Sequence, residues 1–197
     1  MRKATVSTAV SALVLTATAA LLTSCGEQRT PTEAPTPSTT QSGTLAEAPP
    51  TPRDALTKRG DASPGAGLTV SNIEVGAHPG FDRVVYELGG TGVPGWVVQY
   101  TDQATQDGSG RPVDVAGRSV LEVRILGSAY PFDSGVEPYS GPDPATGADA
   151  STVAGVYRNT VFEGTTQSFI GIEGDRPGFS VSTLADPTRL VIDVATE

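Results

Sequence analysis

Residues that could carry out catalysis are few in this chain of 197 residues, which has one cysteine, Cys25, and one histidine, His78. Zinc hydrolases draw on several His and Cys ligands, and cysteine catalysis needs a thiolate beside a base. A Ser-His-Asp triad would need His78 as its base. That residue stands in the turn-like run Ala77-His78-Pro79-Gly80, and no nucleophile-elbow motif occurs elsewhere. These counts argue against all three kinds of enzyme.

Acidic residues are plentiful and leave two alternatives open. Paired carboxylates can hydrolyse a glycan, although acidic loops are more commonly just solvated. Calcium prefers oxygen ligands, and loop acids supply them. The spacing matches no EF-hand, and Asp-Gly and Ser-Gly are ordinary turn dipeptides. We expect no enzymatic activity and no cofactor, and keep as minor calcium candidates Asp102, Asp107 and Asp114 around Asp107-Gly108-Ser109-Gly110, with a second acidic group at Asp133, Glu137, Asp143 and Asp149.

Aromatic side chains offer a further chemistry, because sugar polymers are commonly held by rings stacked against aromatic faces. Trp96 is the sole tryptophan. Alternation places Trp96 and Tyr100 in phase with Val98, which favours a core position for Trp96. The loop aromatics are equally compatible with packing and with binding. The candidate ligand-binding residues are therefore Tyr130, Phe132, Tyr139, Trp96 and Tyr100.

The N-terminus has the order of an export signal. Arg2 and Lys3 precede an apolar run, about residues 6–22, that is too short for a comfortable transmembrane helix, and small residues follow it. Leu22-Thr23-Ser24-Cys25 resembles the lipobox of bacterial lipoproteins. The resemblance implies that residues 1–24 are a signal peptide cleaved before Cys25, and that Cys25 receives a diacylglyceryl group. Two or three acyl chains give durable membrane anchoring. The alternative is an ordinary secretory leader with an incidental cysteine.

The charge balance narrows the partners. The formal net charge is -9, and loss of Arg2 and Lys3 with the leader would make it more negative, which argues against nucleic-acid binding. A single cysteine allows no intramolecular disulfide. Lysine occurs only at Lys3 and Lys58, while arginine and alanine are common, which indicates a GC-rich, actinobacterial source. We expect an extracytoplasmic protein, held by lipid at the outer face of the cytoplasmic membrane.

Residues 25–66 are predicted to be a tether. They are rich in Pro, Thr, Ser, Ala and Glu, and Leu45 and Leu56 are their only large apolar residues. Such a composition cannot offset the entropy of ordering, so we expect disorder. About 40 residues of coil span roughly 35 Å. Thr and Ser beside Pro leave O-glycosylation open, although a plain spacer is the simpler interpretation.

Residues 67–197 are predicted to form one all-β domain. Apolar residues alternate with polar ones, and Gly, Pro and Asp separate short runs, which favours a β-sandwich of about eight mostly antiparallel strands. A bulge near Ser71-Asn72, a bend at Arg158-Asn159 and a turn over Gly76–Gly80 are expected. Asp82-Arg83 and Arg189 with Asp193 could form cross-strand ion pairs. The predicted strands are Leu68–Val75, Phe81–Leu88, Trp96–Tyr100, Ser119–Leu126, Val153–Glu163, Gln167–Ile172, Phe179–Leu184 and Arg189–Val194, and Gly127–Ser151 is a long irregular segment whose aromatics should pack in part.

An ordered set of short runs resembles the AMIN-like domain of actinobacterial lipoproteins. The runs are Phe81–Leu88, Pro94-Gly95-Trp96 with Tyr100, Asp107–Gly110 with Val113, Phe162-Glu163-Gly164 with Gln167 and Phe169, and Pro187–Val194. The resemblance implies a β-sandwich that localises its owner by binding envelope polymers, including peptidoglycan. No catalytic domain follows Val194, so the amidase activity found beside some AMIN domains is not expected here.

The sequence therefore predicts a lipid-anchored, extracytoplasmic binding or localisation module, with an envelope polymer such as peptidoglycan as its ligand. A scaffold for envelope proteins is the alternative, and a carboxylate-dependent glycan hydrolase is a further one.

Overall fold

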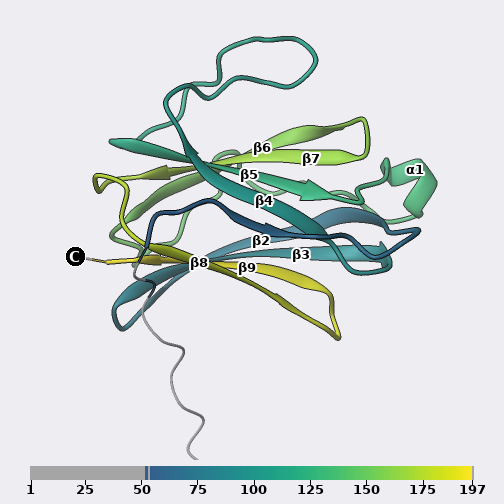
Figure 1. Ribbon diagram of the computed structural model, residues 1–197, viewed down its shortest axis with the longest axis horizontal. Helices are drawn as coiled ribbons and strands as arrows, with labels where there is room; N and C mark the ends of the chain where they lie inside the picture. Colours follow the sequence, from purple (N-terminus) through teal and green to yellow (C-terminus); the bar gives the residue numbers. More distant parts are fainter. Residues whose placement is uncertain (1–51, 53, 197) are drawn as a thin grey trace, which may run out of the picture. The chain divides into compact units, whose positions relative to one another are not determined.

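The computed structural model describes residues 52 and 54–196, without the side chains of 158–160. The predicted signal peptide, Cys25 and the tether up to residue 51 lie outside the described residues. Two antiparallel sheets face each other, one in the order β1-β4-β5-β7-β6 and the other in the order β2-β3-β9-β8 (Figure 1). The elements are β1 (Lys58–Gly60), β2 (Gly67–His78), β3 (Phe81–Thr91), β4 (Gly95–Thr101), β5 (Ser119–Leu126), α1 (Pro131–Ser134), β6 (Val153–Phe162), β7 (Thr165–Ile172), β8 (Phe179–Leu184) and β9 (Arg189–Ala195). The predicted all-β sandwich is confirmed.

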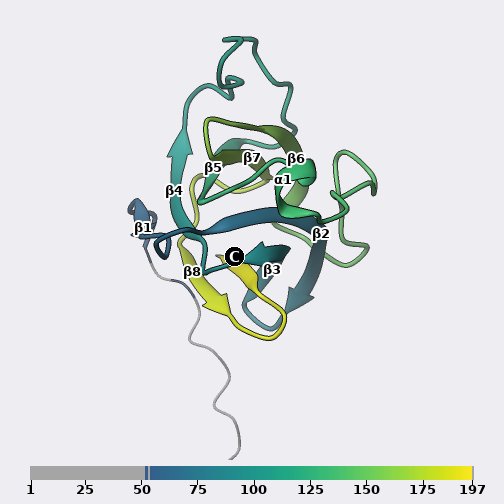
Figure 2. The same ribbon diagram turned by 90° about the vertical axis from the view of Figure 1, so that its right-hand side faces the viewer.

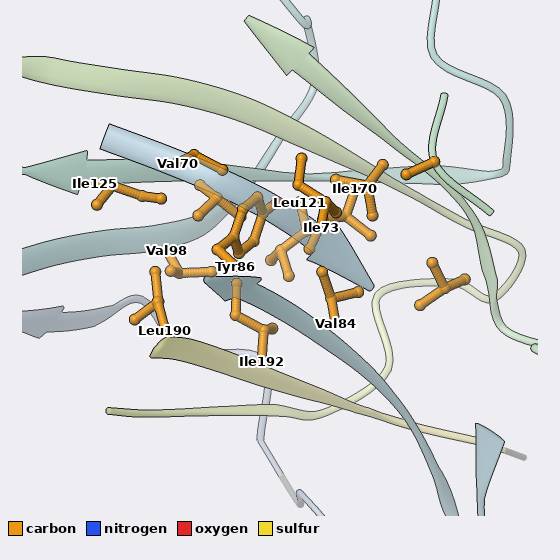
Figure 3. Close-up of a cluster of buried hydrophobic side chains, with 14 of the residues drawn as sticks. Val70, Ile73, Val84, Tyr86, Val98, Leu121, Ile125, Ile170, Leu190 and Ile192 are labelled. Carbon is orange, nitrogen blue, oxygen red and sulfur yellow. The ribbon is translucent and has the colours of Figure 1, made fainter. Parts of the chain in front are cut away.

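Alternation along the strands builds the core between the sheets. In β5, Leu121, Val123 and Ile125 are fully buried, while the residues between them are half-buried on the other face. β3 contributes Val84 and Tyr86 from the opposite sheet (Figure 3). Each buried side chain of this size stabilises the fold by about 1.5–3 kcal/mol, so the two inner faces hold the sheets together without a disulfide.

Two local irregularities that the sequence predicted are present. The register of β2 against β3 shifts between Val70 and Asn72, and the bulge returns both Val70 and Ile73 to the core. The register of β6 against β7 shifts between Arg158 and Val161, which matches the expected bend. The expected turn over Gly76–Gly80 is wrong in its first half, because β2 continues to His78 opposite Phe81.

The ordered chain begins earlier than expected. Residues 54–60, which we name the strap, cross from the four-stranded sheet to the five-stranded one. The Asp54 carbonyl accepts a hydrogen bond from Phe179 N–H at 2.9 Å, and β1 pairs with β4. A Cβ built on Gly60 would lie 2.5 Å from the Trp96 ring, so the ring covers the glycine backbone. The prediction of disorder up to residue 66 is wrong here, because backbone pairing and a ring contact order the strap, while its one large apolar side chain, Leu56, stays exposed.

The segment between β5 and β6 carries α1 at one end of the sandwich and then follows the β2 edge (Figure 2). It runs beside β2: Leu68 N–H donates to the Gly127 carbonyl at 3.0 Å, and Tyr139 N–H donates to the Val70 carbonyl at 2.9 Å. α1 is a single short turn within it. No helix among residues 52–196 is long and apolar enough to cross a membrane.

Candidate functional site

An aromatic pair stands on the α1 turn at that end of the sandwich. Pro131 begins α1, with Tyr130 before it and Phe132 after it. The two rings are stacked, with centroids 5.3 Å apart and planes 5° apart. Tyr130 is 42% exposed and Phe132 is 81% exposed. Large apolar side chains displayed together in this way mark binding surfaces more often than isolated ones do. We name Tyr130 and Phe132 the aromatic pair.

The turn beneath the aromatic pair is held by buried polar groups. Thr69 on β2 is 3% exposed, and its hydroxyl lies 2.7 Å from the Ser134 hydroxyl and donates to the Ala129 carbonyl at 3.0 Å. Gly135 ends α1 with φ of 69°, a conformation that glycine adopts without strain. The rings therefore project from a fixed base rather than from a loose loop, which lowers the entropy cost of binding.

Tyr139, the third loop aromatic, serves a different purpose. It is 7% exposed and packs in the core, and its hydroxyl donates to the Pro142 carbonyl at 2.8 Å. A Cβ on Gly141 would lie 2.5 Å from its ring, so the chain folds tightly around it. The structure therefore does not bring Tyr139 to the surface with the aromatic pair, and its role is to fix the segment that carries them.

Trp96 and Tyr100 on β4 also lie away from the aromatic pair. Trp96 is half-buried and packs against the core, as the alternation predicted. The Tyr100 hydroxyl donates to the Pro177 carbonyl at 2.7 Å, and its ring meets Phe179 edge-on at 5.7 Å. Burial raises the pKa of Tyr100 above its ordinary value. Tyr100 therefore fastens β4 to the β8 side of the sandwich, while Trp96 packs over Gly60 of the strap.

The calcium candidates are not gathered into a site. Asp107 forms an ion pair with Arg124 at 2.7 Å, and its hydrogen bonds raise the pKa of that guanidinium. Asp102 pairs with Arg176 instead, and Asp114 is exposed. Among the described residues, no three His, Cys, Asp or Glu side chains are placed to hold a metal ion. Asp107 acts as a fastening for the long 102–118 loop, because its N–H also donates to Gln167 Oε1 at 2.9 Å.

The two neighbours Asp82 and Arg83 point to opposite faces of β3. Arg83 pairs with Asp193 across β3 and β9 on the outer face, Nε to Oδ1 at 2.7 Å and Nη2 to Oδ2 at 2.8 Å. The partner expected for Asp193 is therefore wrong, because Arg189 instead donates from Nε to the Pro187 carbonyl at 3.3 Å. Asp82 is 1% exposed and makes no ion pair with another described residue. Its Oδ2 accepts the backbone N–H groups of 151–153 at 2.9, 2.7 and 3.0 Å, while Oδ1 has no partner among the described residues. Asp82 therefore caps the start of β6, and its expected ion pair is wrong.

The chain matches the family model of the AMIN-like domain over residues 68–196, which is more than half of its length. It belongs to the AMIN-like family. Membership implies an extracytoplasmic location associated with the cell envelope. No curated protein and no solved structure matches the chain. The match begins after the strap, so the strap lies outside the matched residues.

A second surface of this AMIN-like domain was missed by the sequence reasoning. A hollow of about 290 Å³ lies on the outer face of the β2-β3-β9-β8 sheet. Val191 is 2% exposed although it faces outward, because long side chains stand around it. The sequence signal for this hollow lies in the outward-facing positions of the strands, where charged residues are mixed with valines. The hollow is lined by Glu74, Val75, Gly76, His78, Arg83, Val85, Leu184, Arg189 and Val191.

Proposed function

We propose that this AMIN-like protein is a lipid-anchored binding module without enzymatic activity, and that it holds an envelope glycan such as peptidoglycan against the aromatic pair. The observation that carries the proposal is the stacked, exposed arrangement of Tyr130 and Phe132. The apolar face of a sugar ring fits a fixed aromatic face, and the polar groups of the surrounding loop fit its hydroxyls. The family's association with the envelope supports the same ligand class.

Co-sedimentation with insoluble peptidoglycan tests the binding step. Phe132→Ala removes the ring that is 81% exposed, so it leaves the core intact and should weaken binding about tenfold, which is about 1.4 kcal/mol. His78→Ala is the matched control, because His78 is also an exposed ring stacked on a neighbour, Phe81, but lies at the far end of β2. Equal binding by both variants and the unchanged protein would refute the role of the aromatic pair.

Catalysis is tested in the same samples by chromatography of the muropeptides. We expect the peptidoglycan to remain uncut after long incubation. Release of fragments that disappears when Asp133 and Glu137 are both neutralised would overturn the non-enzymatic part of the proposal. Both carboxylates are exposed, so their removal should not disturb folding.

The anchor is supported by the lipobox-like run before Cys25 and is tested separately. Mass spectrometry of the mature N-terminus should find an acylated Cys25. Cys25→Ser should move the protein from the membrane fraction to the soluble one. A mature protein that begins elsewhere and carries no lipid would refute the anchor and leave the glycan-binding test unaffected.

A further inference from the structure

The outer strands of the two sheets are covered unequally. β2 is covered by 127–139, and β6 exchanges hydrogen bonds with the segment before it, Val156 with Ala145 at 2.9 and 2.8 Å. β1 is only three residues long. β8 has six residues, and a single backbone hydrogen bond reaches its outer side within the described chain, from Phe179 N–H to the Asp54 carbonyl. β8 is therefore the long edge that this fold leaves open.

The register of β8 shows which backbone groups face outward. The Gly178 carbonyl accepts from Ala195 N–H at 2.9 Å, so Gly178 and every second residue after it bond to β9. The N–H and C=O groups of Val181 and Thr183 consequently point away from the sheet. Unpaired edges of this kind are usually protected by charge, proline or a bulge. The β8 run Phe-Ser-Val-Ser-Thr-Leu has no charge and no proline, and its register against β9 is unbroken.

We propose that β8 pairs antiparallel with β8 of a second copy of this chain, about a two-fold axis at Ser182. In this register Val181 of each copy exchanges both backbone hydrogen bonds with Thr183 of the other, which makes four new bonds. An axis at Val181 would need the Phe179 N–H, which the strap already holds at Asp54. The strap therefore disfavours the Val181 axis, and an axis at Thr183 would set Val181 opposite residue 185, beyond the end of β8. About Ser182 the two four-stranded sheets join into one.

A second copy fits this edge better than other occupants. The outward groups are symmetric about Ser182, and the uncharged strands do not repel each other. Leu184 at one end of the strand is 43% exposed, and Leu56 in the strap, close to the other end, is 73% exposed. Two-fold pairing brings Leu184 of one copy towards the strap of the other. The chain's own N-terminal segment is a poor strand for this edge, because Pro49, Pro50 and Pro52 cannot donate hydrogen bonds.

The test places charges at the proposed axis. The Ser182 side chain is exposed on the outer face and would lie about 4.5–5.5 Å from its copy, measured between Cβ atoms. Ser182→Lys and Ser182→Glu should each be monomeric alone, while an equimolar mixture should dimerise. Analytical ultracentrifugation at low salt, from micromolar concentrations to about 1 mM, measures this on the purified protein carrying Cys25→Ser, which excludes lipid-driven association. Ser140→Lys and Ser140→Glu are the control pair, since Ser140 is exposed in the segment beside β2, away from β8.

Each outcome decides the proposal. A dimer of the unchanged protein, lost in each Ser182 variant and restored in the mixture, supports pairing about Ser182. An unchanged protein that stays monomeric over the whole concentration range overturns it. A dimer that survives Ser182→Lys shows that another surface associates, and a mixture that stays monomeric shows that the axis lies elsewhere. Ser182→Lys should still co-sediment with peptidoglycan, so this result is independent of the aromatic pair.

Discussion

Asp82 offers the sharpest test of how the sandwich is closed. Replacing it with alanine removes the acceptor of three backbone N–H groups that start β6. Ser151 is exposed, so its N–H can turn to water, but Thr152 and Val153 are 8% and 4% exposed. A buried donor without a partner costs about 1–3 kcal/mol, which gives about 2–6 kcal/mol for the two. Against a total stability of about 5–15 kcal/mol, Asp82→Ala should be severely destabilising.

Asp82→Asn separates the hydrogen bonds from the charge. The amide oxygen can keep the three bonds in weaker, neutral form, while its NH₂ group takes the place of Oδ1, which has no partner in the described chain. We expect a loss of about 1–3 kcal/mol, which is smaller than that of the alanine variant. Desolvation of the carboxylate acts in the opposite sense, because a buried charge destabilises the fold and its removal relieves that cost.

Urea unfolding followed by Trp96 fluorescence measures both variants, since Trp96 is the sole tryptophan and packs against the core. Glu137→Gln, at an exposed carboxylate, is the control and should change stability by less than about 0.5 kcal/mol. A loss below about 1 kcal/mol for Asp82→Ala would refute the capping role. A stabilised Asp82→Asn would show that desolvation of the charge outweighs its hydrogen bonds.

Three further predictions concern the core, the strap and the 102–118 loop. Burial raises the pKa of Tyr86, so above about pH 10 the unfolded chain loses the phenolic proton while the folded chain keeps it. The free energy of unfolding should therefore fall by about 1.4 kcal/mol per pH unit in that range, and it should fall less steeply in Tyr86→Phe. Unfolding measured at several alkaline pH values tests this. Gly60→Val should displace the Trp96 ring that covers it and detach β1, shifting the tryptophan emission to longer wavelength, and an unshifted spectrum would contradict this contact. Asp107→Asn should weaken the pair with Arg124 by about 1 kcal/mol and speed protease cleavage within 102–118, whereas Asp114→Asn, at an exposed carboxylate, should leave the rate unchanged.

The strands could be predicted from the sequence because burial imposes a period of two. The Val70 to Ile73 break in phase even revealed the β2 bulge, since only an extra residue returns both side chains to one face. The strap could not be predicted, because its order comes from backbone bonds to β8 and β4, which leave no hydrophobic pattern. The composition therefore predicted a domain start at residue 67, later than the strap, where the ordered contacts begin.

The candidate site could be predicted only in part, for a similar reason. The loop aromatics were recognised by residue type, but the choice between surface and core depends on contacts distant in sequence, such as Thr69 with Ser134 for the exposed pair and Val70 with Tyr139 for the buried ring. Asp82 was misread because its partners lie about 70 positions later in the chain. The open β8 edge follows from sheet order, which the pattern of a single strand does not contain.

The strap determines how the domain would respond to mechanical load. Tension that reaches residue 54 from the N-terminal side meets the Asp54 to Phe179 hydrogen bond and the three-residue β1 before it meets any longer strand. These contacts are few and near the surface, so they should yield first and lengthen the chain while strands β2 to β9 stay paired. Moderate pulling would then release residues 54–60 as additional extended chain and expose the edge of β4, without unfolding the rest of the domain.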